Sequence, residues 1–186
     1  MGKRREIAKK VCAVARRAIE SYFEKAEVGT LAKELLPPFL KERGGAFVCL
    51  KRNGQLRGCI GTVFPCRESL IEEIIQNAVS AATEDRRFQP LSKSELSAVA
   101  ITVDILSKSE TVTDLSTLNP KKFGVIVGWQ RLRGVLLPDL EGVDTAEEQL
   151  SIARRKAGIP SGVPVTIRRF TVDRYQEDDE GEGGIE

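Results

Sequence analysis

The chain has 186 residues, which is the size of one ordinary domain or of two small lobes that share a core. Its 41% apolar and 30% charged residues are typical of a globular protein, and 29 basic against 27 acidic side chains leave a net charge of only +2, which argues against a general polyanion binder. Because the chain has no histidine, Ser-His-Asp catalysis, Cys-His catalysis and histidine zinc sites are excluded.

The length of the apolar runs and the spacing of the cysteines limit where the protein can be located and which metal sites it can form. The apolar runs reach about six residues, as in 98–103, whereas a membrane helix needs roughly 20. No signal-type apolar segment follows the basic start MGKRREIAKK, so we expect a cytoplasmic protein. The four cysteines contain no Cys-x-x-Cys pair, which argues against a zinc or iron–sulfur site, and the sequence indicates no cofactor. In a reducing compartment we expect no disulfide.

The first half of the chain predicts helices around a strand pair. Apolar residues at helical spacing predict a helix over 7–22 and another over 70–82. A shorter helical stretch over 31–36 ends at Pro37 and Pro38, because proline cannot continue a helix. Between them, an Asn-Gly pair separates AFVCLKR from QLRGCIGTV, and such a pair between two strand-like runs is a strong hairpin signal.

The second half predicts more strands, one helix and a tail. A strand over 97–107 alternates apolar and polar residues, and two further strands flank GWQR. Thr145 with Glu148 forms a capping box that opens a helix, which Gly158 ends. A last strand covers 163–175. Mixed helices and hairpins favour an α+β fold with antiparallel sheet. The segment QEDDEGEGGIE has one apolar residue, so we expect 176–186 to be a disordered acidic tail.

The Asn-Gly turn sets a register for the first hairpin. With a two-residue loop, Cys49 lies opposite Gly58 and the next residue back, Val48, lies opposite Cys59. Arg57 and Cys59 then share one face, and Cys49 points to the other. We therefore expect Cys49 and Cys59 to point apart and to form no disulfide.

Cys59 is the candidate reactive group of this strand. Gly58 and Gly61 weaken the strand and leave room for a ligand or for another backbone. Arg57, about 7 Å away by strand rise, would lower the thiol pKa and favour the thiolate. A buried cysteine that packs as a small hydrophobe against a close backbone explains the same residues. The sequence leaves both readings open.

Other polar residues extend the candidate site. Arg87 can hold an anion, and Asp85 can orient Arg87 or Arg57, although an ion pair at a helix end fits equally well. The candidate catalytic residues are Cys59 and Arg57, and the candidate ligand-binding residues are Gly58, Gly61, Thr62, Asp85 and Arg87. Five Arg-Arg pairs would bind phosphate if clustered, but ten aromatic residues supply little base stacking, so we expect weak nucleic-acid binding at most. LRG also recurs at 56–58 and 132–134, too short a match to establish a duplication.

A series of short motifs makes the chain resemble a known family. LRGCIGT, preceded by GAFVCLKRNGQ, resembles the signature of the AMME-region protein family, whose bacterial and archaeal members are called AmmeMemoRadiSam system protein A. The ordered series continues with Asp85-Arg86-Arg87-Phe88, Pro90-Leu91, Glu95-Leu96, Leu136-Leu137-Pro138 and Lys156-Ala157-Gly158. Arg86 stands where the family usually has proline. Phe123 stands where it often has histidine, which puts any mechanism using that histidine in doubt here.

The resemblance, which covers roughly residues 5–175, implies an α+β fold of two lobes, each with an antiparallel sheet, and a signature segment near the region between them. We therefore predict one domain of two interleaved lobes over 1–175, followed by the tail. The resemblance also implies a pathway or complex with a Memo-like and a radical SAM protein. Independently of it, we expect an unidentified small molecule or peptide as a further partner. The family's biochemical activity is not settled.

Three classes of function follow. An enzyme would use Cys59 with Arg57 in a cleft between lobes, an interaction module would hold a protein or peptide there without catalysis, and a nucleic-acid binder would use the arginine pairs. If the thiol is functional, Cys59 should be alkylated faster than the other three cysteines, and Arg57→Gln should slow that labelling.

Overall fold

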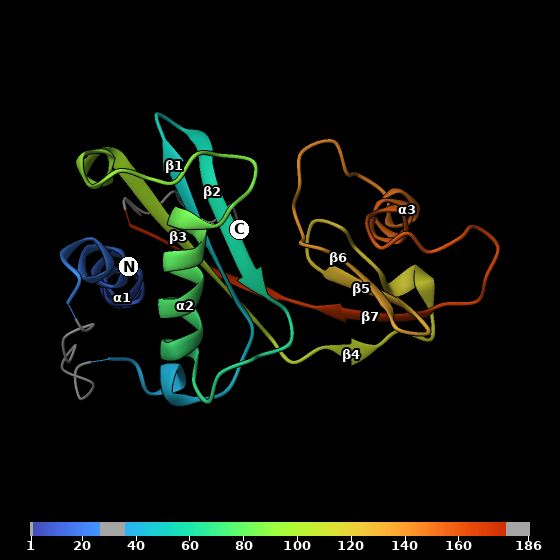
Figure 1. Cartoon of the computed structure of the whole chain (residues 1–186). Helices are drawn as coiled ribbons and strands as arrows, with labels where there is room; N and C mark the ends of the chain where they lie inside the picture. The colour runs from blue at the N-terminus through green and yellow to red at the C-terminus, as the bar shows by residue number, and fades with distance from the viewer. Residues whose placement is uncertain (1, 27–35, 178–186) are drawn as a thin grey trace. The chain divides into compact units, whose positions relative to one another are not determined.

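Two compact units make up the chain in the computed structural model, which describes residues 2–26 and 36–177. The first consists of Met1–Ile105 with Arg174–Glu186, and the second of Leu106–Asp173. Each contains a four-stranded antiparallel sheet and at least one helix, which confirms the predicted α+β class (Figure 1).

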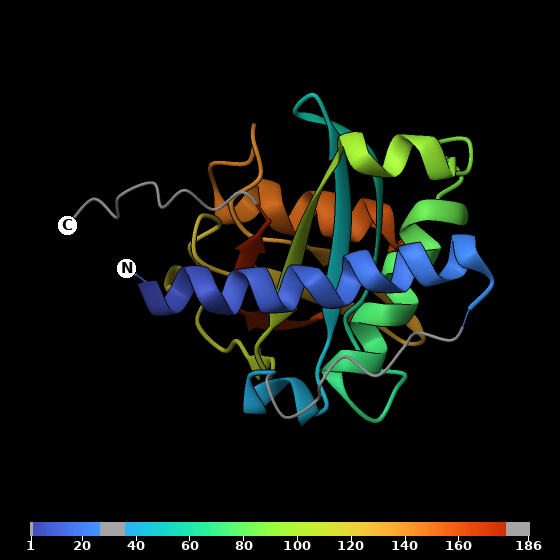
Figure 2. The same ribbon diagram turned by 90° about the vertical axis from the view of Figure 1, so that its left-hand side faces the viewer.

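The first unit packs two helices on one face of its sheet. The strands β1 (Ala46–Arg52), β2 (Gln55–Thr62), β3 (Val99–Leu106) and β8 (Val172–Gln176) lie in the order β2-β1-β3-β8. Helix α1 (Gly2–Glu24) lies across the front of this sheet in Figure 2, and α2 (Leu70–Thr83) packs beside it. Short 3₁₀ turns, η2 (Pro38–Lys41) and η3 (Lys93–Ala98), complete the unit.

Alternation along the strands determines which face is covered. In β1, Ala46, Val48 and Leu50 are fully buried in the core with apolar residues of both helices, whereas Phe47 and Cys49 on the opposite face are only half-buried. Burying such side chains contributes roughly 1.5–3 kcal/mol each. The hydroxyl of Ser69 accepts a hydrogen bond from the Glu72 backbone and caps α2, as the N-terminus of a helix requires.

The second unit packs one helix on its sheet. Its strands, in the order β4-β7-β5-β6, are β4 (Glu110–Thr111), β5 (Gly124–Trp129), β6 (Leu132–Leu136) and β7 (Thr166–Phe170). Helix α3 (Ala146–Lys156) covers one face, and the 3₁₀ turn η4 (Leu115–Thr117) precedes β5. The predicted hairpin around GWQR, the Thr145 capping box and the left-handed Gly158 (φ +65°) are all confirmed.

The C-terminal predictions need correction. The predicted strand over 163–175 is two strands, β7 and β8, which belong to different sheets. The disordered tail was predicted to begin at residue 176, but Gln176 ends β8. The Glu177 carboxylate accepts hydrogen bonds from the Arg16 guanidinium and from the Ile101 amide, at 3.1 Å from the amide. Residues 178–186, and the helical stretch predicted over 31–36 apart from Leu36, lie outside the described residues.

The register predicted for the first hairpin is wrong beyond the turn. Asn53 (φ 51°) and Gly54 (φ 75°) form the expected turn, and the two residue pairs next to it match the prediction. The register then shifts by one residue between Leu50 and Lys51, so that β2 carries one extra residue, a β-bulge. Cys49 consequently lies opposite Cys59, and the two form a disulfide, contrary to both expectations above.

Helix α2 explains why the bulge occurs. Gly58 packs directly on the backbone of α2, where a Cβ would overlap the carbonyl oxygen of Ala81. Only a strand shifted by one residue turns Gly58 to this face, where it lies opposite Leu50. The second LRG segment repeats the arrangement, because a Cβ at Gly134 of β6 would overlap the Ala153 carbonyl of α3. The LRG echo therefore marks, in both units, a hairpin glycine that allows close helix approach.

No helix in the described part of the chain is long and apolar enough to cross a lipid bilayer.

Candidate functional site

The centre of the candidate site is the Cys49–Cys59 pair on the face of the first sheet that lies opposite the helix-covered core. The two Cα atoms are 4.0 Å apart. The Cys59 amide points away from β1, so the two residues form a non-hydrogen-bonded antiparallel pair, the kind in which side chains approach most closely. Both cysteines are half-buried rather than sealed in the core. The pairing of β1 with β2 therefore places the two cysteines next to each other.

Asp85 and Arg87 hold the outer edge of β2 at Cys59. The Cys59 amide donates to Asp85 Oδ2 (2.9 Å), and Arg87 Nη2 donates to the Cys59 carbonyl (3.3 Å). Arg87 also donates to both Asp85 oxygens, from Nε at 2.9 Å and from Nη2 at 2.7 Å. The two side chains thus replace the hydrogen bonds that a neighbouring strand would make, and they cover an edge that would otherwise be open.

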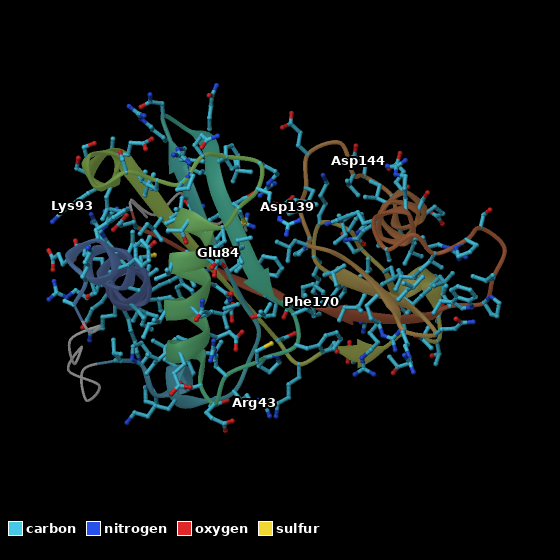
Figure 3. All side chains as sticks on the ribbon, in the orientation of Figure 1. Arg43, Glu84, Lys93, Asp139, Asp144 and Phe170 are labelled. Carbon is cyan, nitrogen blue, oxygen red and sulfur yellow. A yellow bond between two sulfur atoms is a disulfide. The ribbon has the colours of Figure 1, made fainter. Side chains whose placement is uncertain are left out.

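The side chains of Asp85 and Arg87 differ in their exposure to solvent. The Asp85 side chain is 5% exposed, whereas that of Arg87 is 57% exposed. Hydrogen bonds from the Arg87 guanidinium, and then from the Cys59 and Arg87 backbone, hold the pKa of Asp85 well below its ordinary value, although burial opposes this. Both residues follow Glu84, labelled in Figure 3, at the C-terminal end of α2. The helix end therefore delivers a permanently ionised carboxylate to the strand edge.

Arg57 does not face the thiol as predicted. Its Nε and Nη2 donate to the two Glu95 oxygens (3.2 Å each), and its Nη1 donates to the Gln89 carbonyl (2.9 Å). As the extra residue of the bulge, Arg57 reaches sideways to the segment that leads into η3. Its charge therefore holds that segment on β2 and is not directed at Cys59.

Acid should weaken the ion pair between Arg57 and Glu95. The pKa of Glu95 is lowered from its ordinary 4.5 to about 2, first by the hydrogen bond from Arg57 and then by the Ser92 amide. Because the folded-state pKa is depressed, the stabilisation is fully present above pH 4.5 and is lost as the pH falls towards 2. We expect the wild type to lose more stability than Glu95→Gln between pH 5 and pH 2 in urea unfolding. Equal losses in the two proteins would contradict the assigned role.

Thr62 belongs to a different network, on the α2 side of β2. Its hydroxyl donates to the Glu73 carboxylate and accepts from Asn77 Nδ2 (3.2 Å). Glu73 is 1% exposed, and its other oxygen accepts from the amides of Cys66 (3.0 Å) and Arg67 (2.9 Å). This buried carboxylate shapes the loop between β2 and α2. Thr62 is thus an anchor for the loop, not a group that faces the cysteine pair.

Gly58 and Gly61 make room for the protein's own atoms. Gly58 admits the α2 backbone, and Gly61 lies under the ring of Phe47, which occupies the position of its missing Cβ. The predicted space for a ligand is therefore filled at both positions.

Of the seven predicted site residues, the structure brings together Cys59, Asp85 and Arg87, and it directs Arg57, Gly58, Gly61 and Thr62 to structural contacts. Sequence reasoning missed Cys49, Glu95 and Glu73. The signal for Cys49 was present, because two cysteines flank one tight turn at positions a single bulge brings into register. For Glu73 we find no sequence signal, since it reads as a polar helix residue. Among residues 2–26 and 36–177, no cluster of three or more candidate ligands could hold a metal ion.

The chain is an α+β protein of two units, each with an antiparallel sheet, and the first unit carries a cysteine pair at the edge of its sheet. Comparison with known proteins gives its family. The AMMECR1 family model matches residues 12–178, and the chain belongs to this family. A protein from Thermotoga maritima is 52% identical over 164 residues, which cover 86% of this chain and 93% of that protein.

Two further relatives extend the comparison. A Clostridium acetobutylicum protein is 44% identical over 169 residues, covering 88% of this chain but only 35% of that longer protein. The crystal structure of an uncharacterised protein from Pyrococcus horikoshii superposes with a TM-score of 0.82 at 30% identity, covering 93% of this chain and 92% of that one. These names assign no activity.

Proposed function

We propose that the LRGCIG segment carries a thiol–disulfide exchange site, in which Cys49 and Cys59 alternate between a dithiol and a disulfide. The observation that carries the proposal is the direct opposition of two half-buried cysteines on adjacent strands. A disulfide that served only to hold the hairpin would add little, because β1 is already bonded on both sides along its length. Neither cysteine is sealed in the core, and the proposed exchange requires that a small thiol reach their sulfur atoms.

The exchange proceeds in two displacements. An incoming thiolate attacks one sulfur of the Cys49–Cys59 bond, that bond breaks, and its electron pair leaves on the other cysteine, which takes a proton from water. A second thiolate attacks the incoming sulfur of the mixed disulfide and releases the remaining cysteine as thiolate. Two thiols are oxidised to one disulfide, and the protein disulfide is reduced to two thiols. The reverse sequence transfers a disulfide to the substrate.

Asp85 and Arg87 act as positioning residues for Cys59. They fix the backbone of Cys59 on both its amide and its carbonyl, so the cysteine keeps its place opposite Cys49 when the disulfide opens. Because the carbonyl oxygen and Sγ of one cysteine lie within about 5 Å of each other, the Arg87 guanidinium lies within roughly 8 Å of the sulfur. The Asp85 carboxylate lies equally close to Cys59, at its amide, and pairs with Arg87, so the two charges largely offset each other at the sulfur. The pair therefore acts by fixing the backbone position of Cys59.

The proposal includes the setting in which exchange occurs. We place the protein in the cytoplasm, where thiols are kept reduced and the disulfides that form are usually transient, catalytic or redox-sensing. A Memo-like protein and a radical SAM protein, the partners implied by the family resemblance, are the first candidates for a protein thiol that exchanges with this pair. A Cys59→Ser variant, which leaves Cys49 to trap a mixed disulfide, should retain such a partner on non-reducing gels.

The exchange is tested on the folded protein. The Cys66→Ser variant removes the exposed free thiol and leaves Cys12, which is buried. After equilibration in mixtures of reduced and oxidised dithiothreitol, maleimide labelling and mass spectrometry should find Cys49 and Cys59 labelled together, in proportion to the reductant. Labelling should reverse on reoxidation, and circular dichroism should show the fold intact throughout.

Two results would refute the proposal. Labelling of Cys49 and Cys59 only under denaturing conditions would make them packing residues. If the folded protein kept both thiols and formed no disulfide at any ratio of reduced to oxidised dithiothreitol, the proposed reaction would be excluded. As a control, Cys12 should stay unlabelled in the folded protein, because its side chain is fully buried.

A further inference from the structure

The charges nearest the cysteine pair indicate the class of thiol that reacts there. On β1, Lys51 lies two residues beyond Cys49 on the same face of the sheet, because β1 pairs with β3 without any irregularity. Two residues of strand rise place the two Cα atoms about 7 Å apart. Lys51 is exposed, and in the part of the chain that the structure describes no carboxylate lies within ion-pair distance of its ammonium group.

A second cation lies at the strand edge. The exposed guanidinium of Arg87 is held at the Cys59 carbonyl, on the side of the pair that faces away from β1. Its next neighbour in the chain, Arg86, is also exposed. The disulfide is therefore flanked by the Lys51 ammonium along its own face and by the Arg87–Asp85 ion pair, with exposed Arg86 beside it, at its edge.

Among the residues that the structure describes, most carboxylates near the cysteine pair are engaged by arginines. Asp85 accepts from Arg87 and from the Cys59 amide, and Asp104, the buried acid on this face of β3, pairs with Arg174 at 2.8 and 2.9 Å. Glu95 is shared by two arginines, Arg52 (3.3 Å) and Arg57 (3.2 Å). Exposed Glu84 precedes Asp85 and offsets part of the positive charge. With Asp85 offset by Arg87 and Glu84 by Arg86, the Lys51 ammonium leaves a positive charge beside the pair, which favours an approaching anion over an approaching cation.

We propose that the substrate of this exchange site is a small thiol that carries a negative charge, such as a carboxylate or sulfonate, near its sulfur. This inference rests on the proposed exchange reaction and names its substrate class. Lys51, on the same face of the sheet as Cys49, attracts the charged end of the thiol while the thiolate of that substrate attacks the disulfide.

The experiment compares three thiols of similar size and different charge. The oxidised protein is reduced with 2-mercaptoethanesulfonate (anionic), 2-mercaptoethanol (neutral) or cysteamine (cationic). Each rate is divided by the rate at which the same thiol reduces bis(2-hydroxyethyl) disulfide. This normalisation corrects the comparison for differences in the intrinsic reactivity of the three thiols. At about 10 mM salt we expect the anionic thiol to exceed the neutral one roughly threefold and the cationic one roughly tenfold. Salt of about 1 M should abolish the differences.

Variants locate the effect. Lys51→Met should remove most of the preference for the anionic thiol over the cationic one, and Arg87→Met should weaken it. Lys9→Met makes the same charge change at an exposed position of α1, on the helix-covered side of the sheet, and should leave the preference intact. Equal normalised rates for the three thiols, or an equal effect of Lys9→Met and Lys51→Met, would overturn this inference while leaving the exchange site standing. A disulfide that no thiol reduces would overturn both.

Discussion

Replacing Gly58 with alanine should destabilise the protein by about 3 kcal/mol or more. The added Cβ would overlap the Ala81 carbonyl oxygen, which is helix backbone and cannot rotate away, so either α2 must move off the sheet or the bulge must shift. Urea unfolding monitored by circular dichroism measures the loss. Because the bulge also sets the register of Cys59, the variant should form the Cys49–Cys59 disulfide less readily than the wild type.

Gly61→Ala is the matched control. Its added Cβ would meet the ring of Phe47, a half-buried side chain that can turn aside, so we expect a smaller loss of about 1–2 kcal/mol. If Gly58→Ala were as stable as the wild type, the space beside Gly58 would be open, and the ligand-access role that the sequence allowed would return.

Asp85→Ala should cost about 2–3 kcal/mol. The change leaves the Cys59 amide without its acceptor at the strand edge and removes the two carboxylate oxygens that accept from Arg87, which keeps only the Cys59 carbonyl. Arg87→Met should cost less, about 1 kcal/mol, because its side chain is more than half exposed and water replaces part of its hydrogen bonding. Chemical unfolding of each variant at pH 7 gives the values.

Arg86→Met is the control for this pair. Arg86 is exposed, lies between the two residues in sequence, and forms no ion pair with the described residues, so its replacement should change stability by less than about 0.5 kcal/mol. If Arg86→Met destabilised the protein as much as Asp85→Ala, the loss of stability would reflect the charge of this segment rather than the hydrogen bond between Asp85 and the Cys59 amide.

The two largest effects share a physical origin. Both Gly58 and Asp85 act where α2, or the segment leaving it, meets the backbone of β2. The LRGCIG segment is therefore constrained mainly by backbone contacts, and the cysteine pair lies on the face of β2 opposite α2. Residues that read as a ligand site in sequence, such as Arg57 and Thr62, act through the protein's own carboxylates instead.

The amino-acid sequence by itself determined the local elements. Capping residues such as Thr145, the left-handed Gly158 and the Asn53-Gly54 turn act over a few residues, so their chemistry can be read directly from the chain. The same signals, with the mixture of helices and hairpins, were enough for the α+β class and for the family resemblance.

Tertiary structure alone decided the pairing of the cysteines and the partners of the charged residues. A two-residue turn fixes only the residue pairs beside it. The bulge that brings Cys49 opposite Cys59 depends on the helix backbone at Ala81, which lies 23 residues after Gly58 in the chain. Glu73 became a buried anchor only because the loop before α2 folds its amides onto that carboxylate. Contacts of this kind depend on distance in space rather than on spacing in sequence, so no local pattern specifies them.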